Sequence, residues 1–424
     1  GGTLAFTGGV VATAPSAVTV NGTVTAAGTG VITLGDSDTG VAIASNATIG
    51  GTSTGAITLG AATLVDGATL TVGTGIANTI SLSSVTGTAA GTASHLTINT
   101  TGAVTISGAV GTDVGTITIT NSGGTTFNST VDAATVAITS TSLNNAVTFN
   151  GNLNLTSGMT VGAGSAAYNV AINGSSNTIA GTTTFSNTGT VTLGNGGDTI
   201  NFTGGVVATA PSAVTVNGTV TAAGTGVITL GDSNTGVTIG GASTIGSTST
   251  GTITMGAIAL NNNLTLGAGV ATPISLTTVT GPSSSTANLT FDTTGSITVS
   301  GAIGTNVGTL TITNSGGATF SGTVAASTVT LTNTTGTITF AGALTATTLN
   351  TAAQAYNLAL NASTGTITNA VTFSNTGTLA LGASGGTLTF NGGLTATAPS
   401  ASTLKGTITS SNDAITFGPI TLGA

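Results

Sequence analysis

Residues 6–37 read FTGGVVATAPSAVTVNGTVTAAGTGVITLGDS, and the identical string returns at residues 202–233. A degenerate third copy opens at Phe390 as FNGGLTATAPSASTLKGTI, at a similar distance along the chain. Segments between these landmarks also align, for example ITITNSGGTTF ending at Phe127 with LTITNSGGATF ending at Phe320. The chain is therefore built from tandem copies of one long unit.

The repeat divides the 424 residues into four parts. Residues 1–5 are the end of a preceding unit, 6–201 and 202–389 are two full units, and 390–424 are the start of a third. No linker or change of composition separates them, so we expect one continuous structure. Both ends fall inside the repeating pattern, which leads us to expect an excerpt from a longer array and a mature or internal fragment.

Within each unit, threonine alternates with apolar residues over short stretches. Examples are TITIT (116–120), TLTIT (309–313), TVTL (190–193) and TITF (337–340). Strict alternation is typical of half-buried β-strands, and threonine and other β-branched residues favour extended backbone. Clusters of Gly, Asn and Ser recur about every 8 to 12 residues, as turns should. We find no amphipathic helical stretch, so we predict an all-β protein.

The spacing of the phenylalanines suggests how these strands are arranged. Several pairs recur at a similar short interval: Phe127 and Phe149, Phe185 and Phe202, Phe320 and Phe340, Phe373 and Phe390. A coil of roughly 20 residues would place such rings in line along its interior. Each strand would then pair with the next coil about 4.8 Å away, with apolar side chains inside and threonine ladders outside.

We therefore predict a parallel β-helix, or β-solenoid, with roughly 20 residues per coil. The chain would make about 21 coils and an elongated rod about 100 Å long. The alternative is a string of β-sandwich domains of about 95 residues each. We prefer the solenoid, because sandwich arrays usually contain linkers and bulky aromatic cores, whereas this chain is only 3% aromatic.

The composition excludes many functions. The chain carries nine Asp, one Lys, no Glu, no Arg and no Cys. One histidine cannot form a multi-histidine metal site, no thiol can act as nucleophile, and one lysine cannot make a basic surface for nucleic acid. A hydrophobic fraction of 39% with a mean hydropathy of +0.51 opposes disorder. The apolar runs are only a few residues long, so we expect no membrane span in this fragment.

The strings GTVTAAGTGVITL, VTISGAVGT and TTFSNTGTVTL resemble the β-strand-repeat regions of large bacterial surface exoproteins, such as filamentous-haemagglutinin-like proteins and autotransporter passengers. The resemblance covers essentially the whole chain. It implies a right-handed parallel β-helix that is secreted and displayed on the cell surface as an adhesin, stalk or fibre. That family shares no catalytic residues, so the resemblance assigns none here.

Two acidic turns are candidate cation sites, because hard cations such as Ca²⁺ prefer several carboxylates in one loop. Asp36 and Asp38 lie in GDSDTG, but the second copy reads Asp232, Ser233, Asn234, so one carboxylate becomes an amide. Asn195-Gly196-Gly197-Asp198 is similar to part of a calcium-binding nonapeptide, yet it occurs only once and such repeats bind in tandem. We interpret both segments as turns at coil corners, the first as an Asx turn.

Catalysis by paired carboxylates, as in polysaccharide-degrading β-helices, is opposed by the repeat. Most Asp positions are not acidic in the other copy: Asp113 aligns with Asn306, Asp132 with Ala325, and Asp292 with Asn99. The same comparison pairs His95 with Asn288, so we expect a polar coil-corner residue there. We expect Lys405 to be a solvated side chain rather than part of an isopeptide crosslink.

Three surface features have a possible binding role. Tyr168 and Tyr356 are equivalent and could stack on sugars, although we favour packing inside a wide coil. Flat threonine arrays on β-solenoids are typical of ice-binding proteins, but here the coils vary in length and threonine occurs on several strands. Asn-x-Ser/Thr triplets, which are acceptors for N-glycosylation, occur for example at Asn21, Asn128, Asn173 and Asn217. We expect them by chance in a chain so rich in Asn, Ser and Thr.

We therefore predict a non-enzymatic extracellular structural protein that needs no cofactor: a stalk or fibre segment of a bacterial surface adhesin or filament. The alternative is a glycan-binding adhesin module, followed by an ice-binding solenoid or a polysaccharide-degrading enzyme. Expected partners are further copies, associating end to end or laterally into a fibre, and a cell-surface or glycan ligand.

Overall fold

The computed structural model of the chain describes residues 1–88, 91–284 and 286–423. It contains two compact units, Gly1–Val214 and Thr215–Ala424, and each is described by itself. The boundary between them lies shortly after the start of the second sequence repeat at Phe202. The described residues contain β-strands and turns but no α-helix, as predicted.

The first unit holds strands β1 to β25: β1 (Thr3–Phe6), β2 (Gly9–Ala12), β3 (Val18–Val20), β4 (Thr23–Ala26), β5 (Val31–Leu34), β6 (Val41–Ile43), β7 (Ala47–Gly51), β8 (Ile57–Leu59), β9 (Ala62–Leu64), β10 (Thr69–Val72), β11 (Ile80–Leu82), β12 (Val85–Gly87), β13 (Ser94–Asn99), β14 (Val104–Ile106), β15 (Val110–Gly111), β16 (Val114–Asn121), β17 (Thr125–Phe127), β18 (Val131–Ile138), β19 (Ala146–Phe149), β20 (Leu153–Val161), β21 (Asn169–Ile172), β22 (Ser176–Ile179), β23 (Thr183–Phe185), β24 (Thr190–Phe202) and β25 (Gly205–Ala208). Strand β26 (Ala213–Ala222) includes the boundary between the units.

The second unit holds strands β27 to β51: β27 (Val227–Leu230), β28 (Gly236–Ile239), β29 (Ser243–Ile245), β30 (Ile253–Met255), β31 (Ile258–Leu260), β32 (Leu264–Leu266), β33 (Ile274–Leu276), β34 (Val279–Thr280), β35 (Ala287–Asp292), β36 (Ile297–Val299), β37 (Ile303–Ser315), β38 (Ala318–Phe320), β39 (Val324–Thr334), β40 (Thr337–Phe340), β41 (Leu344–Thr351), β42 (Asn357–Leu360), β43 (Thr364–Ile367), β44 (Val371–Thr372), β45 (Thr378–Leu381), β46 (Thr387–Phe390), β47 (Leu394–Ala396), β48 (Ala401–Leu404), β49 (Thr407–Thr409), β50 (Ile415–Phe417) and β51 (Ile420–Leu422).

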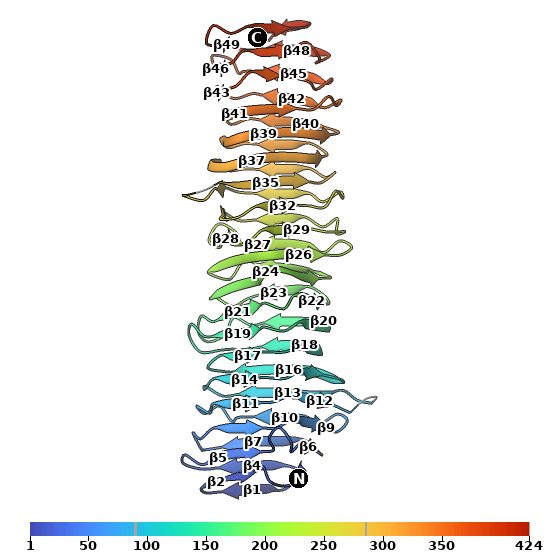
Figure 1. Cartoon of the computed structure of the whole chain (residues 1–424), viewed down its shortest axis with the longest axis vertical. Helices are drawn as coiled ribbons and strands as arrows, with labels where there is room; N and C mark the ends of the chain where they lie inside the picture. Colours follow the sequence, from blue (N-terminus) through green and yellow to red (C-terminus); the bar gives the residue numbers. More distant parts are fainter. Residues whose placement is uncertain (89–90, 285, 424) are drawn as a thin grey trace. The chain divides into compact units, whose positions relative to one another are not determined.

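Each unit is a parallel β-solenoid. In the first unit, β1 pairs with β4, β2 with β5 and β3 with β6, so three strands make one turn there. Further along, β17 pairs with β19 and β19 with β21, because two of the three strands of a turn have joined into one longer strand. All these pairings are parallel, and Figure 1 shows the strands of the first unit (blue to green) as successive rungs. A turn takes roughly 22 residues, close to the predicted coil length.

Individual turns differ in length, because insertions fall in the corners between strands. In the first unit, a short turn joins the register partners Thr116 and Thr135, whereas a longer one joins Thr69 and His95. The strands keep their register despite this variation, because a shift of one residue would turn every inward side chain to the outside.

The alternation of apolar residues and threonine along each strand places the apolar side chains inside the coil. In the stack that runs through β7, β10, β13 and β16, the inward residues Ile49, Val72, Ile98 and Ile119 are paired in register and fully buried. Burying an aliphatic side chain of this size contributes about 1.5–3 kcal/mol. The core is therefore a column of aliphatic side chains in which each coil covers the next.

The predicted phenylalanine pairs all contact one another, but in two different ways. Phe127 and Phe149 are register partners and stack with ring centroids 4.9 Å apart, and Phe320 and Phe340 do the same in the second unit. The two pairs that are closer in sequence, Phe185 with Phe202 and Phe373 with Phe390, meet edge to face. The prediction that these last rings align was wrong, because their spacing is less than one turn and places the two rings on different strand stacks.

Candidate functional site

Threonine ladders cover the outside of the coils. In one stack of the first unit, eight successive register partners point outward between buried neighbours: Thr23, Thr48, Thr71, Thr97, Thr118, Ala137, Thr160 and Thr184. The second unit has a corresponding ladder: Thr219, Thr244, Thr265, Thr290 and Thr311. The predicted ladders are confirmed, and variation in coil length does not interrupt them because corners absorb it.

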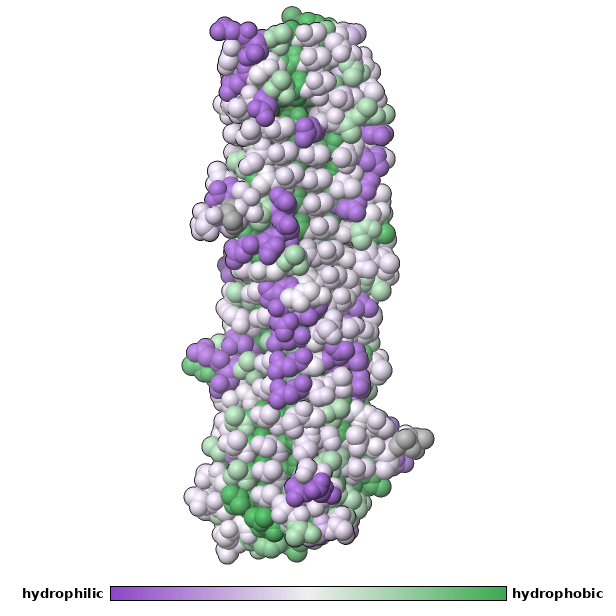
Figure 2. Space-filling model, in the orientation of Figure 1, coloured by the Kyte–Doolittle hydropathy of each residue, from purple (hydrophilic) through white to green (hydrophobic). Residues whose placement is uncertain are grey.

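These ladders make a neutral surface. Among their members there is no ionisable side chain. Figure 2 shows one face of the molecule, on which near-white residues of intermediate hydropathy lie between separate purple and green patches. Each threonine presents a methyl group and a hydroxyl at the spacing of adjacent strands, about 4.8 Å. The arrangement can contact an ordered, uncharged partner, but it offers no general acid or base.

Short rows of amides also link successive coils. Asn150 donates to Asn128 Oδ1 (3.0 Å), and Asn173 donates to Asn150 Oδ1 (3.2 Å). In the second unit, Asn314 donates to Asp292 Oδ1 (2.7 Å). Asp292 thus lies in a ladder in which an amide would serve equally well, which explains why the other copy has an asparagine at that position.

A column of buried polar side chains lies at one corner of the coil, and we call it the corner column. Its members in the first unit are Ser53, Asn78, Thr100, Ser122, Thr141 and Asn187. Its members in the second unit are Ser249, Thr272, Thr293, Ser315, Thr334 and Asn375. All are at most 4% exposed, so the expectation of a purely apolar interior was wrong at this corner.

Hydrogen bonds in the corner column join each coil to the one before it. Thr100 Oγ1 lies 2.7 Å from the carbonyl oxygens of Ile76 and Asn78, and it accepts the N–H of Gly102 (3.0 Å). Thr293 repeats this arrangement in the second unit with Val270, Thr272 and Gly295. The hydroxyls satisfy backbone groups where the chain leaves one strand stack for the next.

The sequence contains a signal for the corner column, although by itself this signal indicates only turns. In most of its members a Ser, Thr or Asn stands two residues before a glycine, as in STG (53–55), TTG (100–102) and NTG (187–189). Turn propensity alone does not reveal that this side chain points inward, because exposed Asx and Ser/Thr turns have the same composition.

Both tyrosines are buried beside this corner. Tyr168 and Tyr356 are 0% exposed, which confirms packing inside the coil and leaves no ring face for a sugar. Tyr168 donates to the carbonyl oxygen of Gly162 (2.6 Å). Burial raises the pKa of the Tyr168 phenol well above its usual 10.0 and raises the pKa of Tyr356 to about 12.

The chain passes closely over each tyrosine. Asn187 donates to Tyr168 O (2.9 Å), and Asn375 donates to Tyr356 O (3.2 Å). A Cβ on Gly189 would lie 2.2 Å from Tyr168 O, so only glycine fits there. The two units thus repeat this corner in detail.

The acidic turn of the first repeat is an Asx turn, as predicted. Asp36 Oδ1 accepts the N–H groups of Asp38 (2.9 Å) and Thr39 (2.8 Å), while Asp38 is exposed. These N–H groups hold the pKa of Asp36 below its usual 3.8. Asp232 repeats the turn with Asn234 and Thr235.

The NGGD segment forms a bend inside the long strand β24. The buried carboxylate of Asp198 accepts the N–H of Asn195 (2.5 Å), and Gly196 and Gly197 have positive φ angles. The aspartate therefore holds a coil corner, in agreement with the predicted turn.

The backbone conformation at Asp113 explains why Asp and Asn alternate between the two copies at this position. Asp113 has a φ of 61° and Asn306 a φ of 67°, in the left-handed region that Asp and Asn tolerate better than other non-glycine residues. Asp113 and Asp132 do line one shallow depression of about 360 Å³, together with Asn154. Asp132 Oδ1 accepts a hydrogen bond from Asn154 (2.7 Å).

His95 is a half-buried polar residue, but it lies inside strand β13 and not at the predicted coil corner. Its Nδ1 accepts the N–H of Thr116 from the next coil (3.0 Å). Asn288 accepts the N–H of Thr309 through Oδ1 (2.9 Å), so the amide replaces the imidazole without loss of the bond. Lys405 is exposed, in agreement with a solvated side chain.

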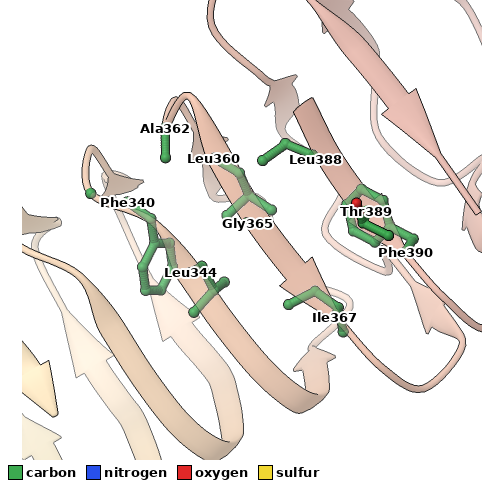
Figure 3. Close-up of a pocket in the computed structure, with 10 residues that line it drawn as sticks. Phe340, Leu344, Leu360, Ala362, Gly365, Ile367, Leu388, Thr389 and Phe390 are labelled. Carbon is green, nitrogen blue, oxygen red and sulfur yellow. The ribbon is translucent and has the colours of Figure 1, made fainter. Parts of the chain in front are cut away.

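The second unit contains one small apolar cavity of about 10 Å³ (Figure 3). Gly365 occupies an inward position between its register partners Leu344 and Leu388, and the missing side chain leaves a gap in the column. The cavity holds at most one water and is lined almost entirely by carbon, so it is a packing defect rather than a ligand site.

No group of three or more His, Cys, Asp or Glu comes together among the described residues. Within the same residues, there is no helix of the length and hydropathy that a membrane crossing requires. Comparison of the chain with protein-family models, with curated proteins and with solved structures found no match.

Proposed function

We propose that this chain is a segment of an extracellular, non-enzymatic structural protein: a stalk or fibre segment of a bacterial surface adhesin or filament. The proposal rests on the observation that the two units share their structural contacts but not most of their acidic residues. They share the threonine ladders, the corner column and the buried tyrosine corner, whereas three of their acidic positions are not shared. Repetition of coil-joining contacts favours a mechanical role, because stability then increases with every coil.

The test is excision of one repeat. Deleting residues 6–201 joins Ala5 to Phe202, and the string that follows, 202–233, is identical to the removed string 6–37, so the seam stays native. We expect the variant to fold as a rod shorter by about 9 coils, or about 43 Å. Electron microscopy of both proteins measures this change.

Deletion of residues 16–201 is the matched control. It removes a similar length but shifts the pattern at the seam, so corners would meet strands and folding should fail. Unchanged particle length after the in-register deletion would contradict a stalk. Saturable binding of the intact chain on a glycan array would replace the proposal with the adhesin alternative.

Ice binding is a second candidate, favoured by the threonine ladder of the first unit. Thr97 and Thr118 lie in mid-ladder, whereas Thr63 lies on a stack that also carries Ala42 and Gly111. An ice-binding face predicts inhibition of ice recrystallisation that Thr97→Lys abolishes and Thr63→Lys leaves intact. Absence of inhibition by the unaltered chain would exclude this candidate.

A further inference from the structure

Three asparagines of the corner column have a buried acceptor with no donor. Asn78, Asn187 and Asn375 are at most 1% exposed, and the Oδ1 atom of each has no hydrogen-bond partner. Their Nδ2 groups are satisfied: Asn78, for example, donates to the carbonyl oxygens of Ser53 (2.7 Å) and Gly55 (2.8 Å). Each amide is therefore held in place by its donor side, while its acceptor side has no protein partner.

The hydroxyl members of the column define what differs at these positions. Thr272 stands where the first unit has Asn78, and its hydroxyl donates to Ser249 O (2.6 Å) much as Asn78 donates to Ser53 O. Threonine leaves no orphan atom there, because its one oxygen is already bonded. Asparagine brings an additional acceptor that the protein does not satisfy.

The orphan acceptor recurs independently. Asn187 and Asn375 are equivalent residues of the two units, and each donates to a tyrosine carbonyl. Each also donates to a carbonyl oxygen a few residues further along its own corner, at Thr190 and Thr378. Both leave Oδ1 without a partner. A feature repeated in two copies is a property of this corner rather than of one local packing arrangement.

We propose that each of these asparagines binds one ordered water molecule, so that the corner column contains three internal hydration sites. A desolvated carbonyl-type oxygen without a donor is costly, and internal waters typically satisfy such groups. The water donates one hydrogen to Oδ1. The corner carbonyls, each with a second lone pair, accept its other hydrogen, which gives the two or more polar contacts that a buried water needs.

The test is a crystal structure of the full chain at a resolution that shows ordered waters, beside two reciprocal variants. We expect a water within hydrogen-bonding distance of Oδ1 at all three asparagines. Asn78→Thr copies the second unit and should remove only the water at that corner. Thr272→Asn should create a new one.

The waters at Asn187 and Asn375 serve as internal controls in both variants. If one variant does not fold, the waters in the unaltered chain still test the proposal. Empty density beside the three Oδ1 atoms of the unaltered chain would overturn it. Rotation of the amides onto a protein donor, or persistence of the water in Asn78→Thr, would do so as well.

Discussion

Replacing Thr100 with valine tests whether the corner column stabilises the coil. Valine has nearly the same shape as threonine, so Thr100→Val removes hydrogen bonds without opening a cavity. The hydroxyl gives one proton, shared by two carbonyl oxygens at 2.7 Å, and accepts the Gly102 N–H at 3.0 Å. A hydrogen bond contributes about 1 kcal/mol, and an orphaned N–H costs about 1–3 kcal/mol, so we expect a loss of about 2–3 kcal/mol.

Thr97→Val is the matched control. Thr97 lies in the strand just before Thr100, in the outward ladder, and its valine variant should change the free energy of unfolding by less than about 0.5 kcal/mol. Urea unfolding followed by circular dichroism measures the difference, and hydrogen exchange at the Gly102 amide localises it. Equal stability of the two variants would refute the reasoning. The pair Thr293→Val and Thr290→Val repeats the comparison in the second unit.

Substitutions at three further residues test other parts of the same structure. Asp113 has a φ of 61°, and Asn306 has a similar φ in the second unit, so Asp113→Asn should leave the free energy of unfolding unchanged. Asp113→Val should lower it by about 1–2 kcal/mol, as measured by thermal or urea unfolding. His95→Asn should leave stability unchanged because Asn288 makes the same bond, but His95→Ala should cost about 1 kcal/mol; a larger loss in His95→Asn would contradict the equivalence. The buried Tyr356, with its pKa raised from 10.0 to about 12, contributes stability that is complete below pH 10 and is lost as pH rises through 12. Tyr356→Phe should reduce this alkaline loss in a pH titration of stability.

Several residues of the candidate sites were predictable because their roles are local. Asp36 bonds to N–H groups two and three residues away, so the Asx turn can be read from the segment GDSDTG itself. The replacement of His95 by Asn288 between copies indicated a polar side chain without special chemistry, and both accept a backbone N–H. Comparison of the two repeats thus supplied information that a single copy would not.

The corner column was not predictable, because its contacts join residues about one turn apart in the chain. Ser53 Oγ reaches Gly30 O, and Thr100 Oγ1 reaches Ile76 O. A serine or threonine beside glycine has the same local preference whether it points to solvent or inward. Which of these occurs depends on the carbonyl oxygens that the preceding coil presents to the side chain.

The sequence by itself determined the all-β class, the parallel coil and the outward threonine ladders, because a period of two residues leaves one face apolar and a near-regular repeat stacks like on like. The tertiary structure decided burial. Thr97 and Thr100 lie three residues apart in the same segment, yet Thr97 points outward in the ladder, whereas Thr100 is fully buried and bonded to the carbonyl oxygens of Ile76 and Asn78. The same residue type therefore has two environments, because the free energy of burial depends on a neighbouring coil that lies about one turn away in the chain.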